Sequence, residues 1–224
     1  LVNQRHHGLQ LLRQTLGDAA ISYQQLGGYE LFLEKDIRLY ESCVDRMKEV
    51  NSLLNPIFKD RVFSSVSNTF GFSKIQNNYI RNQFEGQIDT GQMMQELIKK
   101  VQQLGVIILN NTTVESFSEG SDNVAIKTNH FEFSASKLIL TTNGFAQQLI
   151  NEDVQPARAQ VLITKPLRNL TIKGTFHLDC GYYYFRNIDQ RILLGGGRNL
   201  DFKAETTTEL AQTERIQNAL EALL

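Results

Sequence analysis

The side chains best suited to bind a small anionic group lie in one short segment, 182–186, with the sequence Tyr-Tyr-Tyr-Phe-Arg. Side chains two positions apart in a β-strand point to the same face, so Tyr182, Tyr184 and Arg186 would lie together. A guanidinium can bind a carboxylate through two parallel hydrogen bonds, and a phenol hydroxyl can donate another. The segment therefore predicts either a carboxylate-binding strand or an amphipathic strand that leaves Arg186 in solvent.

Other kinds of chemistry have no recognisable pattern in this sequence. It has no GxGxxG or GxxxxGK[ST] phosphate loop between a strand and a helix, and no GxSxG nucleophile motif. The histidines and cysteines lack metal-ligand spacing, so we predict no metal site, and we assign no catalytic residue. No helix pattern follows Gly195-Gly196-Gly197, which favours a bulged strand end or a close approach to a ligand.

The composition is that of a globular protein without a strongly charged partner. Over 224 residues the 23 basic and 24 acidic side chains nearly cancel, which argues against a general nucleic-acid or anionic-membrane surface. No apolar run is long enough to span a bilayer, and residues 1–7 do not resemble a signal peptide. Cys43 and Cys180 lie far apart in the sequence and are expected to be reduced, so we expect a cytoplasmic protein.

Hydrophobic periodicity predicts the elements that position these residues. In the first third we expect a helix ending at Gly17-Asp18, a β-hairpin or strand pair within 21–33, and a helix over 36–54 that Asn55-Pro56 ends. Residues 62–79 are predicted to form strand and loop. In the last third we expect a strand over 159–164, a hairpin of 182–186 with 191–195, and a helix over 206–224.

The middle of the sequence has the clearest order of elements. A helix is expected from Asp89 or Thr90 to Leu104, with Gly105 as its C-terminal cap. Two buried strands, 106–109 and 137–142, would then enclose an antiparallel excursion at 124–127 and 131–133. This order is typical of an α/β core with an inserted β-meander.

Four stretches carry a resemblance to a known family. Glu85–Gly91 resembles the family's "G-x-[IV]-[DH]-[PT]" entry to a helix, and Gly105–Phe117 resembles the following strand with its "T-x-V" ending. Lys137–Phe145 resembles a strand that runs into a glycine turn. Gln160–Leu167 with Tyr182–Gly197 resembles the substrate-domain strands. In this order the stretches resemble the FAD-dependent amine and amino-acid oxidoreductases, which include glycine oxidase, sarcosine oxidase and D-amino-acid dehydrogenase.

The resemblance implies a mixed α+β or α/β fold of two parts. Residues 85–150 would be part of an FAD-binding α/β domain with an inserted β-meander. Residues 1–84 and 151–224 would form a mixed-sheet substrate-binding domain with helices on one face. Family members begin with a GxGxxG unit and end with another glycine-rich stretch. Because neither is found here, we expect a fragment that is itself inactive and whose retention of FAD is open.

The resemblance also implies roles for particular residues. FAD would contact Thr113, Val114, Thr141, Thr142, Asn143 and Gly144, with Val114 near the adenine and 141–144 beneath the adenosine and pyrophosphate. Tyr182, Tyr184 and Arg186 would bind the substrate carboxylate. Without the resemblance, Val114 is equally a core residue at a strand end and Asn143-Gly144 an ordinary turn.

The function implied is oxidation of a small amine or amino acid by hydride transfer from its Cα–H to the flavin. A 2-hydroxy-acid or glycerol-phosphate dehydrogenase is one alternative, although a phosphate substrate should require more basic residues near Tyr182 than Arg186 and Arg198. A non-catalytic ligand-binding module with the same fold is another. The sequence leaves the substrate, the electron acceptor, the flavin linkage and the oligomeric state open.

Overall fold

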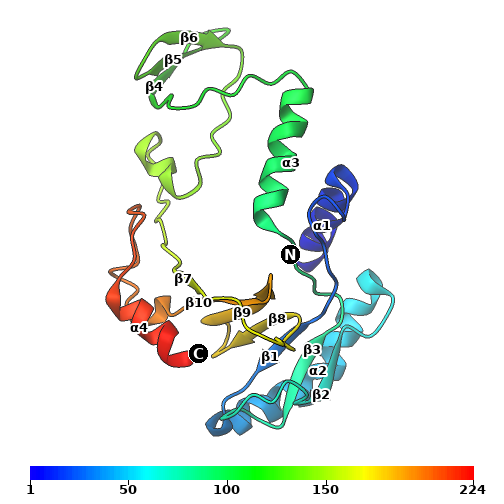
Figure 1. The fold of residues 1–224 in the computed structure, drawn as a ribbon. Coiled ribbons are helices and arrows are strands. Elements are labelled where there is room, and N and C mark those ends of the chain that lie inside the picture. Colours follow the sequence, from blue (N-terminus) through cyan, green and yellow to red (C-terminus); the bar gives the residue numbers. More distant parts are fainter. The chain divides into compact units, whose positions relative to one another are not determined.

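The computed structural model of the protein describes residues 1–224 and contains two compact units (Figure 1). The first, here called the sheet unit, comprises Leu1–Lys100, Gln160–Leu200 and Gln212–Leu224. The second, here called the meander unit, comprises Val101–Ala159 and Asp201–Ala211. No helix is long and apolar enough to cross a membrane.

The sheet unit is built on a seven-stranded mixed sheet with the strand order β2-β3-β1-β8-β9-β10-β7. β1 and β8 form its parallel pair, and the other neighbours are antiparallel. The strands are β1 (Gly28–Leu31), β2 (Phe63–Ser67), β3 (Asn78–Asn82), β7 (Val161–Ile163), β8 (Thr175–Leu178), β9 (Tyr183–Ile188) and β10 (Arg191–Gly196). The β1–β8 pair therefore joins two parts of the chain that lie far apart in sequence.

One face of this sheet, the closed face, carries most of the buried core. Phe176 of β8 is fully buried and stacks on Phe185 of β9 and on Tyr29 of β1, at centroid distances of 4.7 and 5.0 Å. Phe70 and Phe72, from the loop between β2 and β3, pack edge-on against Phe176. Farther along, helix α4 (Glu214–Leu223) packs Ile216 and Leu220 against Leu194 of β10.

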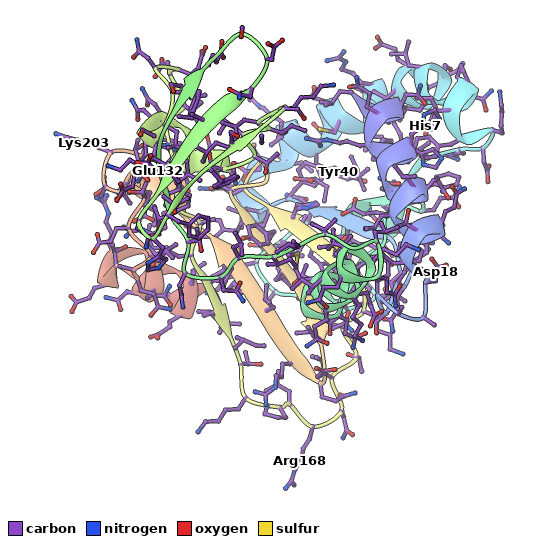
Figure 2. All side chains as sticks on the ribbon, turned by 90° about the horizontal axis from the view of Figure 1, so that it is seen from above. His7, Asp18, Tyr40, Glu132, Arg168 and Lys203 are labelled. Atoms are coloured by element: carbon purple, nitrogen blue, oxygen red, sulfur yellow. The ribbon has the colours of Figure 1, made fainter.

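The opposite face, the open face, is covered by a helix only at one end. Helix α2 (Ile37–Phe58) buries Met47 against Ile80 of β3, and the hydroxyl of Tyr40 (Figure 2) lies 2.8 Å from Ser65 Oγ. The mixed sheet confirms the predicted fold class. The expectation of helices on one face was wrong. The apolar Ile80 of β3 lies on the open face and is covered by α2, whereas Leu194 of β10 lies on the closed face and is covered by α4.

The meander unit contains a three-stranded antiparallel sheet of β4 (Val114–Glu119), β5 (Val124–Thr128) and β6 (Glu132–Ala135). β5 and β6 correspond to the strands expected at 124–127 and 131–133, whereas β4 was not part of the expected pair. The segments 154–159 and 201–211 are tied together in this unit by Arg158 and Glu205. The Arg158 guanidinium donates to both carboxylate oxygens of Glu205, at 2.9 and 3.0 Å, and Glu205 is almost completely buried. This ion pair fixes the part of the unit that lacks regular strands.

Three local predictions are confirmed. β9 and β10 form the expected hairpin, with Asp189 and Gln190 at φ +45° and +58°, as a type I′ turn requires. Helix α3 (Thr90–Gln103) begins where expected, because Asp89 Oδ1 accepts a hydrogen bond from the Gln92 N–H. The remaining helical elements are α1 (Val2–Leu16), which stops before Gly17 as predicted, and the short 3-10 helices η1 (Glu34–Asp36), η2 (Asn143–Gln148) and η3 (Arg198–Leu200).

The expected hairpin within 21–33 was wrong. Only β1 forms there, and its neighbours are β3 and β8 rather than a strand next to it in sequence. The predicted helix end at Asn55-Pro56 was also wrong, because α2 continues to Phe58. Lys59 ends it with a left-handed φ of +58° and an N–H bond to the carbonyl of Asn55.

Three further expectations were corrected in or near the meander unit. Residues 106–109 and 137–142 form no strands, and Ile107 and Ile139 are about four-fifths exposed, at 82% and 80%. An apolar run becomes a strand only where another strand pairs with its backbone, and residues 1–224 provide none for these runs. The last helix begins at Glu214 rather than 206, because the buried side chain of Gln160 bonds both the N–H and the hydroxyl of Thr213.

Candidate functional site

The predicted carboxylate-binding residues lie on or next to β9. Tyr184 and Arg186 share the open face, where their partners across the sheet are His177 and Thr175 of β8. Tyr182 immediately precedes β9 and is 43% exposed. Its backbone is fixed on both sides, since its N–H bonds Asp179 and its carbonyl accepts the Gly197 N–H.

Arg186 is only partly exposed and is hydrogen-bonded within the sheet unit, which does not match the simple amphipathic interpretation of this strand. Its Nη1 donates to the carbonyl of Ile88 at 2.7 Å, a residue 98 positions away in the sequence. Beside it the Thr175 hydroxyl donates to Glu85 Oε1 at 2.7 Å. The segment 85–88 thus lies across the open face. Its bond to Arg186 uses one N–H of the guanidinium, which has four more N–H donors.

The glycine run after β10 allows two close approaches. The Tyr184 phenol lies against Gly195, where an added Cβ would be 2.6 Å from its Cζ and its hydroxyl oxygen. At Gly196 an added Cβ would be 2.0 Å from the carbonyl oxygen of Tyr182, and φ is +128°. The run is therefore a strand end in which side chain and backbone approach closely, and Gly195 sets the position of the Tyr184 ring.

Two further polar residues of the open face were not identified from the sequence. Glu30 of β1 lies directly opposite His177 of β8, with Oε2 3.9 Å from Nδ1. Both side chains are a little more than one-third exposed. Burial raises the pKa of Glu30, and His177 opposes this effect. Neither residue lies in a motif, and only the parallel β1–β8 pair brings them to Tyr184.

The predicted FAD residues all lie in the meander unit. The backbone N–H and carbonyl of Thr113 are both bonded to Asn129, and Val114 pairs with Thr128 at the start of β4. These bonds fix the strand end but occupy the Thr113 backbone groups. Val114 is part of a ladder with a bulge before Ser116.

The second group of predicted FAD residues, 141–144, borders a cavity. The carbonyl of Thr142 accepts the Phe145 N–H, Asn143 has a φ of +48°, and a Cβ on Gly144 would lie 3.3 Å from Pro156. Asn143 and Gly144 line a cavity of about 380 Å³ together with residues 154–159 and 207–210. Small-molecule sites span roughly 300–1,000 Å³, so this cavity lies near the small end of that range. Thr113, Val114, Thr141 and Thr142 do not line it.

The model of the family described as FAD dependent oxidoreductase matches residues 2–224, which is almost the whole chain. The chain belongs to this family. No protein with curated annotation shows significant similarity to it in sequence. FAD is the cofactor that membership of the family implies, which supports the cofactor prediction.

Several solved structures share the fold of this chain at low sequence identity. L-proline dehydrogenase from P. horikoshii is 16% identical with a TM-score of 0.70, and iminodiacetate oxidase from Chelativorans sp. is 15% identical with 0.71. Glycine oxidase from Bacillus cereus is 12% identical with 0.72. Each alignment covers 99% of this chain and 60% of the other, so the chain spans about three-fifths of their length.

Proposed function

We propose that this chain serves the FAD-dependent oxidation of a small amine or amino acid. The observation that carries the proposal is the polar strip of the open face, where Tyr184, Arg186, His177 and Glu30 lie on adjacent strands. Proline, iminodiacetate and glycine, which name the enzymes of similar fold, each combine an amine nitrogen with a carboxylate. The strip offers cationic and anionic groups for both ends of such a molecule.

In this proposal Tyr182, Tyr184 and Arg186 bind the carboxylate of the substrate. Arg186 uses one of its five N–H donors for Ile88, and this bond orients the guanidinium while the other donors can bind oxygen. The Tyr182 and Tyr184 hydroxyls add hydrogen bonds. FAD, when bound, accepts the hydride from the Cα–H of the substrate, which leaves an imine.

The proposal also assigns the FAD contacts within the meander unit. Asn143 and Gly144 would contact the cofactor along the 380 Å³ cavity, because their backbone lies at its wall. Thr113, Val114, Thr141 and Thr142 remain proposed contacts of the adenosine end. The buried Arg158–Glu205 pair ties segment 154–159, which lines this cavity, to the segment that continues into the lining residues 207–210.

The test is the visible spectrum of the natural protein, expressed with every residue that its gene encodes. We expect a flavin spectrum that bleaches without oxygen on addition of glycine, sarcosine, L-proline or a D-amino acid. A 2-hydroxy acid, such as lactate, should leave the spectrum unchanged. A protein that stays colourless and cannot be reconstituted with FAD would contradict the proposal, and bleaching by lactate alone would favour the hydroxy-acid alternative.

Substitution of Tyr182 tests the carboxylate assignment. Tyr182→Phe should raise KM for an amino acid by about 2- to 10-fold, since one hydrogen bond contributes about 0.5–1.5 kcal/mol, and should leave KM for the corresponding amine without a carboxylate unchanged. Equal effects on both substrates would place the carboxylate elsewhere.

A further inference from the structure

A line of three polar side chains crosses the uncovered part of the open face. Glu30 of β1 is the direct cross-strand partner of His177 of β8, and His177 is the direct partner of Tyr184 of β9. Directly opposed side chains on one face lie about 4.5–5.5 Å apart at Cβ. His177 is therefore between a carboxylate and a predicted substrate-binding phenol, with 37% of its side chain exposed.

Oxidation of an amine requires a proton acceptor as well as a hydride acceptor. An aliphatic ammonium group is mostly protonated at neutral pH. Its nitrogen must lose that proton before its lone pair can form the C=N bond as the Cα–H leaves as hydride. None of the substrate-binding residues assigned above is suited to this task, because a guanidinium stays charged and a phenol is normally neutral.

We propose that His177 accepts this proton and that Glu30 is the positioning residue that orients its imidazole; this assignment rests on the proposed function. In the step, the N–H bond of the substrate ammonium breaks and its proton moves to His177 Nε2, giving a neutral amine and an imidazolium. Glu30, 3.9 Å from Nδ1, stabilises the positive charge formed on the ring.

The neighbouring groups favour His177 over the other bases of the open face. The Glu85 carboxylate lies against Gly28, and its Oε1 already accepts the hydrogen bond of the Thr175 hydroxyl. Glu30 lies one strand farther than His177 from the proposed substrate-binding residues on β9, and histidine is the side chain that serves most often as a general base. The titratable and charged groups facing Glu30 and His177 from the elements around them are Asp36, Cys43, Glu85, Asp179, Cys180, Tyr184 and Arg186.

The pH dependence of anaerobic flavin reduction in the natural FAD-loaded protein tests the proposal, with glycine and L-proline as the substrates. His177→Gln should slow reduction by about 100-fold at pH 7, in the range of one general base. The deficit should shrink as the pH approaches that at which the substrate amine deprotonates by itself. The matched control is His7→Gln on α1 (Figure 2), an exposed histidine that should react like the wild type at every pH.

Two outcomes of this experiment have different meanings. If the wild type is reduced and His177→Gln follows the same pH profile, the proton-acceptor role is overturned while the proposed function stands. If the wild type is reduced by no amine at any pH, the proposed function fails and this inference fails with it. Glu30→Gln should lower the rate less than His177→Gln and shift the pH profile without abolishing its rising limb; an unchanged profile would remove Glu30 from the mechanism.

A second readout needs no flavin. Protonated His177 lowers the pKa of Glu30, so carboxyl NMR titration of Glu30 should show a higher pKa in His177→Gln than in the wild type. The same pKa in both proteins would mean that the two side chains do not interact, and would contradict the positioning role. A merely structural contribution of His177 would move stability but not this titration.

Discussion

The two faces of the seven-stranded sheet differ in what covers them and in what they are made of. On the closed face Phe176 and Leu194 lie under aromatic rings and α4. On the open face, the alternate positions of β8 and β9 carry His177 and Tyr184, and neither packs in the clusters that α2 and α4 form with the sheet. On the edge strand β7 of the same face, Val161 and Ile163 are exposed. Because strand side chains alternate, the same two strands, β8 and β9, supply both surfaces.

We expect this difference to separate stability from function along one strand. Residues of the closed face should contribute mostly to the free energy of unfolding, while residues of the open face should contribute mostly to binding and proton transfer. Substitutions at adjacent positions therefore test the division directly, because they share a strand and differ only in face.

The largest effect is expected at Phe176. Phe176→Ala removes a fully buried ring from its stacks with Phe185 and Tyr29 and should lower the free energy of unfolding by about 3–5 kcal/mol, measured by urea denaturation. The next residue, His177, is the matched control, and His177→Ala should change stability by less than about 0.5 kcal/mol. Comparable losses in both variants would show that the two faces contribute equally to the core.

The adjacent glycines of β10 should give the next largest difference. Gly196→Ala places a Cβ 2.0 Å from the Tyr182 carbonyl oxygen at φ +128°, so backbone must move and the cost should be about 1–3 kcal/mol. Gly195→Ala meets only the far end of Tyr184, which can swing away, so stability should change little while KM for an amino acid rises. If Gly195→Ala were the more destabilising of the two in thermal unfolding, the Tyr184 ring would be part of the core.

Local features were predictable because their causes are local. The β9–β10 hairpin follows from two alternating segments separated by turn residues, and α3 follows from the Asp89 cap and an apolar stripe. The three-stranded meander likewise joins strands that are next to each other in sequence. In each of these cases the partner of a residue lies within about one turn or hairpin of it.

Long-range partners could not be read from the sequence. Arg186 was predicted to bind substrate from its place in the sequence, but its bond to Ile88 could not be predicted, because this bond and the Thr175–Glu85 bond span 98 and 90 positions. His177 carries no signal of its own, since only the β1–β8 pair places it beside Glu30. The strand predictions for the apolar runs 106–109 and 137–142 were wrong for a related reason. A strand forms only where the backbone of another strand pairs with it, and that partner cannot be read from the run itself.

Two tyrosines on opposite faces of β9 sharpen the comparison further. Tyr184→Phe should leave stability unchanged and raise KM for an amino acid by about 2- to 10-fold, the effect of one hydrogen bond. Tyr183→Phe should leave KM unchanged, because this residue packs with Leu194 and Ile216 on the closed face, where burial raises its pKa. A KM effect at Tyr183 equal to that at Tyr184 would contradict the assignment of the open face to substrate.

The smallest effect is expected from the charge of Glu30 on stability. Burial raises the pKa of this carboxyl above its ordinary 4.5, so the folded state holds its proton more tightly than the unfolded chain. The resulting stabilisation is present below the unfolded pKa and is lost as the pH rises through the folded one. Glu30→Gln, which is neutral throughout, should therefore raise the urea midpoint slightly at pH 7 and lose this advantage near pH 4. Glu221→Gln, which replaces an exposed carboxyl on α4, is the matched control and should leave the urea midpoint at pH 7 unchanged. A lower midpoint for Glu30→Gln at pH 7 would mean that attraction to His177 outweighs desolvation, and the open face would then contribute to stability through this pair.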